Sequence, residues 1–297
     1  MESHQRYLKP EVIAKLKRID LKARLVVEGF LSGLHKSPFK GFSVEFAEYR
    51  AYMPGDELKR IDWKVYAKTD RFYIREYEEE TNLKAYLLLD TSGSMAYASR
   101  GISKLEYASY IAAALSYLLM KQKDSVGLVT FSDKLETYIP PRSSPAHLTA
   151  LLRTIDKTKP GGQTNVAQTF HMLAERIKRR GLVIILSDLL DDKEQVLAAL
   201  RHFRHRKHEV LVFQILDPNE RDFVFKGPLV LRDLETCREL TLDPRVVRRD
   251  YQRSVTEHFR DFERRCGESM IDYHAITSDM SFDKALFSYL EKRSRLG

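Results

Sequence analysis

The sequence predicts an α/β fold in which a mostly parallel sheet is flanked by helices. From residue 83 onward, short apolar runs typical of buried strands alternate with amphipathic helical segments. One such run, residues 87–89, stops at Asp90 and turns through two hydroxyl residues and a glycine before the next helical segment. A strand that feeds a helix in this way ends at the carboxyl edge of a parallel sheet, where open α/β folds place their ligands.

We expect two parts in the 297-residue chain, whose hydrophobic content of 43% is normal for a globular protein. Residues 1–82 are expected to form an N-terminal extension of helix and β segments that packs on the core. Residues 83–297 are expected to form the α/β domain, with a β-hairpin inserted near residues 222–243.

The extension is predicted from three local patterns. Apolar residues recur at mostly helical spacing over residues 11–34, which predicts one helix ending near Gly29 or Gly33. Aromatic and charged residues alternate over residues 42–52, and alternation returns over residues 71–80, as in half-buried strands. Between them, Asp56 follows a Pro-Gly turn and can cap a short helix that carries the single tryptophan, Trp63.

The domain is expected to continue as alternating elements after Asp90. Its expected helices span residues 102–121, 145–155, 166–179, 193–203, 251–265 and 282–292. Its expected strands span residues 125–131, 135–139, 182–186, 209–216 and 270–276, the second being a short edge strand before two prolines. Alternation on both sides of Gly227 and Pro228 predicts the inserted hairpin.

Polar side chains gather at the predicted carboxyl edge of this sheet. Asp90, Ser92 and Ser94 alternate along the turn, so their oxygens can converge on one point and suggest a hard cation. A flexible Gly-Gly turn places Thr164 at an expected helix start, and a second apolar strand ends at Asp188. The candidate metal ligands are Asp90, Ser92, Ser94, Thr164 and Asp188, and the expected ion is Mg²⁺ or Mn²⁺.

This set, D-x-S-x-S followed by a distant Thr and a distant Asp, resembles the metal-ion-dependent adhesion site of von Willebrand factor A domains, and all five positions are matched. The resemblance implies a von Willebrand A-like, Rossmann-like domain. It also implies that a Glu or Asp of a partner protein completes the metal shell. Metal occupancy would then be a condition for partner binding.

The extension resembles the bacterial family called domain of unknown function 58, in which it precedes a von Willebrand A-type domain. The resemblance rests on segments near residues 46–63 and 75–80 and on later segments around Gly227, Asp233 and Asp243. It implies a non-enzymatic adaptor or co-chaperone whose partner is a MoxR-type AAA+ ATPase. Four of its positions are interpreted as a structural network tying this segment to the sheet, and their role stays open: Asp56, Arg60, Asp62 and Trp63.

The main alternative is a Mg²⁺-dependent, phosphatase-like hydrolase that uses Asp90 as its nucleophile. Haloacid-dehalogenase phosphatases also present an aspartate at the end of such a strand, with Mg²⁺ beside it. They need a second Asp two residues on as general acid, and Ser92 stands there with a hydroxyl that cannot replace it. Neither a phosphate-binding glycine motif nor a Ser-His-Asp set is readable, so we do not expect an enzyme.

Charge and composition argue against two further classes. The formal charge of +8 comes from 50 basic residues interspersed with 42 acidic ones, and the basic runs at residues 201–207 and 245–253 lack stacking aromatics, so no nucleic-acid partner is expected. His208 and the nearby histidines are expected at the surface.

No apolar run approaches the ~20 residues of a membrane span. Without a signal core or a disulfide framework at Cys237 and Cys266, the chain is expected to be cytoplasmic. Its client and oligomeric state stay open.

Overall fold

The computed structural model describes residues 10–34, 49–51, 66, 71–75, 83–162, 165–225, 227–234 and 237–294. The chain divides into two compact units, one joining Met1–Gly33 to Leu83–Gly297 and the other holding Leu34–Asn82. In the second unit, β1 (Tyr49–Ala51) pairs antiparallel with β2 (Tyr73–Arg75). The expected turn before Asp56, its short helix and the network of Asp56, Arg60, Asp62 and Trp63 lie outside the described residues.

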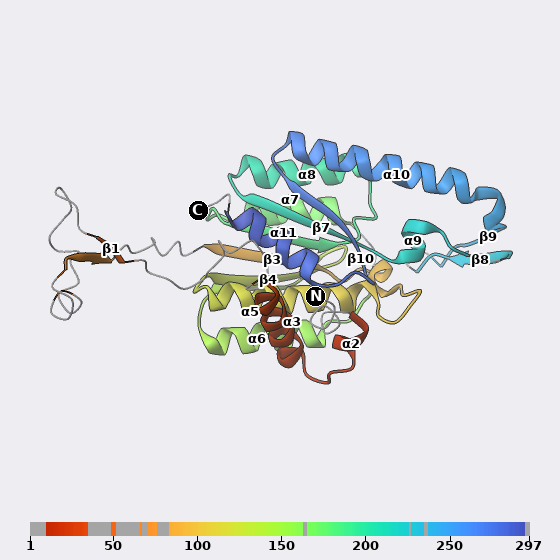
Figure 1. The fold of residues 1–297 in the computed structure, drawn as a ribbon. Coiled ribbons are helices and arrows are strands. Elements are labelled where there is room, and N and C mark those ends of the chain that lie inside the picture. The colour runs from red at the N-terminus through yellow and green to blue at the C-terminus, as the bar shows by residue number, and fades with distance from the viewer. Residues whose placement is uncertain are drawn as a thin grey trace. The chain divides into compact units, whose positions relative to one another are not determined.

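A six-stranded sheet forms the centre of the first unit, in the order β10-β7-β6-β3-β4-β5 (Figure 1). The strands are β3 (Lys84–Asp90), β4 (Ser125–Phe131), β5 (Leu135–Arg142), β6 (Leu182–Ser187), β7 (Glu209–Leu216) and β10 (Asp272–Thr277). All neighbouring pairs are parallel except β4 and β5, which are antiparallel. The predicted mostly parallel α/β sheet is therefore confirmed.

The central strand β3 lies between β4 and β6, and its leucines at residues 87–89 are fully buried. A strand covered on both faces needs such a continuous apolar run. Leu89 is in register with Leu186, so Asp90 comes level with the end of β6. This register brings Asp90 and the residues directly after β6 to the same edge of the sheet.

Helices cover both faces of the sheet (Figure 1). On one face α7 (Val166–Arg176), α8 (Lys193–His205) and α10 (Pro244–Glu268) share an apolar cluster with sheet residues such as Leu88. On the other side lie α5 (Lys104–Lys121), α6 (Pro145–Lys157), α11 (Asp283–Ser294) and the N-terminal α2 (Pro10–Ala14) and α3 (Ile19–Leu34). None of the described helices is long and apolar enough to cross a membrane.

Some expected elements differ in the structure. The single helix expected near the N-terminus is two, α2 and α3, although α3 ends at Leu34, beside Gly33, one of the two expected ends. It runs through Gly29 because packing of its apolar face outweighs the low helix propensity of glycine. Strand β5 continues through Pro140 and Pro141, which an edge strand tolerates because one side of its backbone pairs with no other strand among the described residues. His208, expected at the surface, is 1% exposed, with Nε2 3.1 Å from the Ile177 carbonyl.

Two helix starts in the C-terminal third also differ from expectation. Helix α10 begins seven residues early because Asp243 accepts the Arg245 N–H at 2.9 Å and Pro244 suits the first turn. The short helix α9 (Pro218–Asp222) was not expected, although Asp217 and Glu220 form a capping box. The expected hairpin is present, with β8 (Leu229–Arg232) antiparallel to β9 (Glu239–Leu242).

Candidate functional site

Asp90 is the last residue of β3, and its side chain is fully buried. Its Oδ1 accepts the backbone N–H of Ser92 at 2.9 Å, and its Oδ2 accepts the hydroxyl of Ser187. The Ser187 Oγ in turn accepts the N–H of Leu189 at 2.9 Å. Because Ser187 ends β6, these bonds join the ends of the two strands that carry the predicted aspartates.

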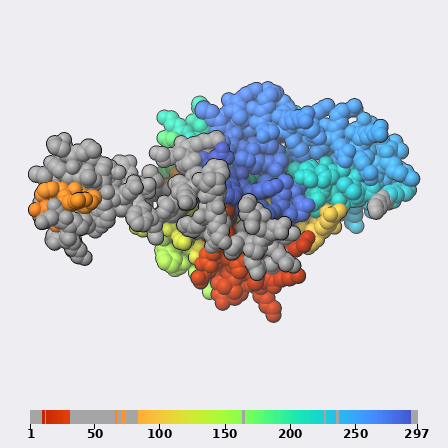
Figure 2. Space-filling view, in the orientation of Figure 1, coloured from red at the N-terminus to blue at the C-terminus, as the bar shows by residue number. Residues whose placement is uncertain are grey.

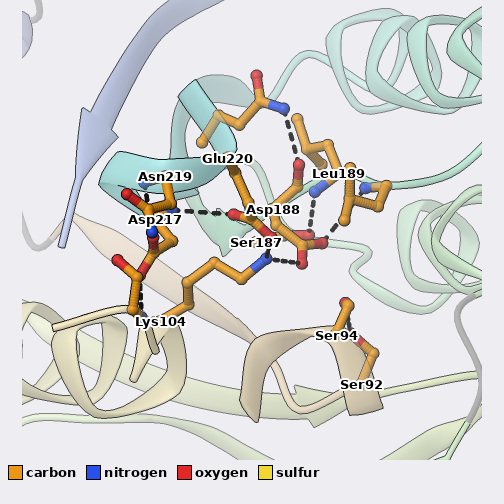
Figure 3. A network of polar contacts seen from close by, with 12 residues as sticks. Ser92, Ser94, Lys104, Ser187, Asp188, Leu189, Asp217, Asn219 and Glu220 are labelled. Atoms are coloured by element: carbon orange, nitrogen blue, oxygen red, sulfur yellow. Dashed lines mark hydrogen bonds and ion pairs between the residues drawn. The ribbon is translucent and has the colours of Figure 1, made fainter. Parts of the chain in front are cut away.

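The two predicted serine ligands lie next to each other. The Oγ atoms of Ser92 and Ser94 are 3.1 Å apart, and Ser92 is fully buried (Figure 3). A short 3-10 helix, η3 (Gly93–Ala96), begins directly after Ser92 and turns the chain so that both hydroxyls fall on one side. Since Asp90 holds the Ser92 backbone, the three oxygen-bearing residues of the first motif form one compact group.

The glycine turn expected to carry the fourth ligand is tied to this motif. The Gly161 N–H donates to the Thr91 carbonyl at 2.8 Å, and the Gly93 N–H donates to the Gly162 carbonyl at 3.2 Å. Gly162 has a φ of +78°, and a Cβ there would lie 3.0 Å from the Ser132 hydroxyl, so the turn requires glycine. Thr164 itself lies outside the described residues.

Asp188 directly follows β6 and is fully buried. Its Oδ1 accepts the N–H of Leu190 at 3.2 Å, and its Oδ2 accepts the ammonium of Lys104 at 2.8 Å. The backbone carbonyl of Asp188 accepts the side-chain amide of Gln214 at 2.7 Å. The predicted second aspartate is thus firmly positioned at the same edge of the sheet as Asp90.

Lys104 and Glu220 belong to this site although the sequence analysis missed them. The fully buried Lys104 side chain lies between Asp188 and Glu220, with Nζ 2.6 Å from Glu220 Oε1 (Figure 3). Burial lowers the pKa of Lys104, but attraction to Asp188 and Glu220 outweighs burial and raises it overall. One sequence signal existed, because Lys104 opens α5 directly after the cap Ser103, where a helix dipole disfavours a cation.

The buried charges do not balance among the described residues of the site. Burial, and then repulsion from Asp188, raises the pKa of Asp90 to about 7. The described part of the site holds three carboxylates and one ammonium: Lys104 pairs with Asp188 and Glu220, and Asp90 lies close enough to Asp188 to be repelled by it. When all are ionised, the site carries an excess of two negative charges. The chemistry of the site therefore fits a divalent cation.

The donor atoms agree with the same kind of ion. Hydroxyl and carboxylate oxygens are the ligands that hard cations such as Mg²⁺ prefer. In the described part of the chain, no group of three or more His, Cys, Asp or Glu side chains is arranged to hold a metal ion. A cation at this edge would therefore depend on the hydroxyls of Ser92 and Ser94 as well as on the aspartates.

Comparison with known families agrees with the sequence motifs. The family model described as "Protein of unknown function DUF58" matches residues 48–261. The chain belongs to this family. Uncharacterized protein Rv1480 of Mycobacterium tuberculosis is similar to it, with 30% identity over 270 residues that cover 88% of this chain and 84% of the relative. The resemblance to domain of unknown function 58 is thereby confirmed.

Solved structures with a similar fold have low sequence identity. The conserved hypothetical protein BatB from Bacteroides thetaiotaomicron aligns with a TM-score of 0.49 and 15% identity, over 72% of this chain and 99% of that chain. The SpRpn10 VWA domain aligns with a TM-score of 0.40 and 9% identity, over 69% of this chain and 93% of that chain. Both TM-scores are below 0.5, and the fold class follows from the strand order of this chain itself.

Proposed function

We propose that this chain is a non-enzymatic, Mg²⁺-dependent protein-interaction module that binds a carboxylate of a partner protein. Its metal ligands would be Asp90, Ser92, Ser94, Thr164 and Asp188, with the aspartates in direct or water-bridged contact. When bound, the cation supplies an electrophilic position that attracts an outside carboxylate. Mn²⁺ has the same ligand preference and would serve in its place.

One observation carries this proposal, namely the two buried carboxylates at the ends of adjacent strands beside two adjoining serine hydroxyls. Buried negative charge is costly unless it is paired. Lys104 pairs with Asp188 and Glu220, whereas Asp90 accepts hydrogen bonds only from Ser187 and Ser92 among the described residues. A cation at the serines would relieve the remaining charge.

The family suggests the kind of partner. Membership in the family together with the von Willebrand A-like site supports an adaptor or co-chaperone role beside a MoxR-type AAA+ ATPase that presents a Glu or Asp. The alternative, a phosphohydrolase, is disfavoured by the residue two positions after Asp90. Ser92 occupies the position of the required general acid, and its hydroxyl cannot replace a carboxylic acid.

Calorimetry with Mn²⁺ tests the cation site. We expect one binding event for the wild-type protein and a loss of affinity of at least about tenfold in Asp90→Asn and in Thr164→Ala, because each variant removes an oxygen ligand or its charge. The matched control is Asp156→Asn, which neutralises an exposed aspartate on α6 and should bind as the wild type does.

The same samples are then titrated with a purified MoxR-type ATPase, in Mg²⁺ and in excess chelator. We expect the complex to form in Mg²⁺ and to dissociate in chelator, with circular dichroism showing that the fold persists. Equal Mn²⁺ binding by wild type and Asp90→Asn contradicts the cation site. A complex that survives removal of the cation contradicts the metal-bridged mechanism.

A further inference from the structure

A groove of about 360 Å³ opens beside the predicted cation site. Ser94, a predicted ligand, lines one end of it together with Leu190, whose N–H donates to Asp188. The rest of the lining comes from Tyr97, α9, the residues that follow α9, the hairpin and Tyr251 of α10. A partner carboxylate placed at Ser94 would therefore carry its neighbouring residues into this groove.

The aromatic wall of the groove is held in place by defined contacts. Phe223 packs against Tyr251 at a ring-centroid distance of 4.4 Å and against Phe225 at 5.1 Å. The Tyr251 hydroxyl donates to the Glu220 carbonyl at 2.6 Å, and the Arg248 guanidinium donates to the carbonyls of Phe223 and Phe225. The groove is thus preformed, which lowers the entropic cost of binding.

The hairpin adds an apolar surface to this groove. Its register places four leucines on one face, namely Leu229, Leu231, Leu240 and Leu242. Leu240 is 59% exposed, and Leu234 at the turn and Leu190, which also lines the groove, are 49% and 53% exposed. Exposed apolar residues gathered in this way mark interaction surfaces. Figure 2 shows the hairpin and α10 in light blue at one end of this unit.

The charges in the groove favour an apolar occupant beyond the Ser94 end. Glu220 pairs with Lys104, and the opposite charges of Arg232 and Asp233 are adjacent in the lining. The volume lies at the low end of the ~300–1,000 Å³ typical of ligand pockets, which suits one or two side chains rather than a large cofactor.

We propose that this groove receives the apolar side chains of the same partner segment whose Asp or Glu reaches the cation. The recognised sequence is an acidic residue with Leu, Met or Phe within a few positions of it. The acidic residue binds at the Ser94 end, and the apolar side chains pack between the aromatic wall and the hairpin leucines. This inference rests on the proposed function and names the chemistry of its partner.

A library of random peptides displayed on phage, selected on the full chain in Mg²⁺, tests the inference. We expect enrichment of peptides that combine an acidic residue with nearby Leu, Met or Phe. The affinity of a synthetic enriched peptide should fall about tenfold in Leu234→Asp, because a charge would then enter the apolar lining. The matched control is Val230→Asp, which alters a 57% exposed residue of the same hairpin outside the groove. Both positions are exposed, so neither variant should unfold the protein.

The outcomes separate this inference from the proposed function. If peptide binding is lost in chelator but unchanged in Leu234→Asp, the groove inference is wrong and the cation site is supported. If peptide binding is lost in Leu234→Asp but unchanged in chelator, the groove is supported and the proposed contact between the partner carboxylate and the cation is wrong. Absence of enrichment, or enriched peptides without the acidic and apolar pair, overturns the inference.

Discussion

Lys104 links the predicted cation site to the surface beside it. Its ammonium donates to Asp188, directly after β6, and to Glu220 on α9. The side chains of Lys104 and Asp188 are fully buried, and that of Glu220 is largely buried. A buried ion pair is maintained only when both partners are present, because either charge alone is strongly disfavoured in a region of low polarity. Lys104 therefore holds the Asp188 side chain in place and anchors α9, whose Glu220 lines the groove.

Replacing Lys104 should lower the stability of the protein and raise its affinity for Mn²⁺. In Lys104→Met, we expect the free energy of unfolding in chelator to fall by about 3–5 kcal/mol, because Asp188 and Glu220 lose their shared cation. The affinity for Mn²⁺ should rise, because a positive charge next to the site is removed. Denaturant unfolding and calorimetry measure the two effects. Lys121→Met, at the exposed end of the same helix, is the control and should change neither. A Lys104→Met protein as stable as the wild type would show that the buried pair contributes nothing.

The sequence predicted part of this site and not its supporting residues. Asp90, Ser92 and Ser94 are found together because the D-x-S-x-S turn has a fixed spacing, and Asp188 joins them because β6, which it follows, pairs in parallel with β3. Ser187 and Lys104 could not be assigned from local pattern. Their partners are 97 and 84 residues away, and nothing in a local spacing names a residue at that distance.

At the scale of elements, the backbone directly before β6 approaches β3 closely at Gly181. A Cβ at this position would lie 2.2 Å from the Lys84 carbonyl oxygen of β3, and that oxygen is backbone that cannot rotate away. The Gly181 carbonyl also accepts the N–H of Glu209, at the start of β7. The starts of β3, β6 and β7 therefore depend on the absence of a side chain at Gly181.

Gly181→Ala should consequently destabilise the protein by about 1–3 kcal/mol, through displacement of β6 from β3. Thermal or denaturant unfolding measures this change. The matched control is Gly267→Ala in α10, where a Cβ meets nothing within 4 Å and alanine should stabilise the helix slightly. If both variants have the stability of the wild type, the strands have room to separate and the close approach is not a constraint.

Element types were predicted better than element ends, for a physical reason. The period of apolar residues identified the central strands and most helices because it reflects which face is buried. Caps and edges are decided by single side chains, as where Asp243 starts α10 early or where β5 runs through two prolines. The 3-10 helix after Ser92 and the short helix α9 have too few residues to show any period.

At the scale of the whole molecule, the N-terminal helix α3 belongs to the sheet unit although residues 34–82 separate it in sequence. Its buried face includes Phe30, which is 2% exposed and lies edge-on to Phe287 of α11 at 4.9 Å. Lys22 donates to the Tyr110 hydroxyl of α5 at 2.7 Å. The sequence predicted that this segment packs on something later in the chain, but periodicity alone could not name α5 and α11.

This packing predicts that α3 unfolds together with the sheet. Phe30→Ala should lower the free energy of unfolding by about 3–5 kcal/mol, since it leaves a cavity against α11. Leu25→Ala, on the same helix at a residue 38% exposed, should cost much less. Denaturant unfolding followed both by far-ultraviolet circular dichroism and by tyrosine fluorescence should give coincident transitions, as one cooperative unit requires. Equal stability of the two variants, or a separate early transition that Phe30→Ala alone shifts, would mean that α3 only rests on the sheet unit and is not part of its core.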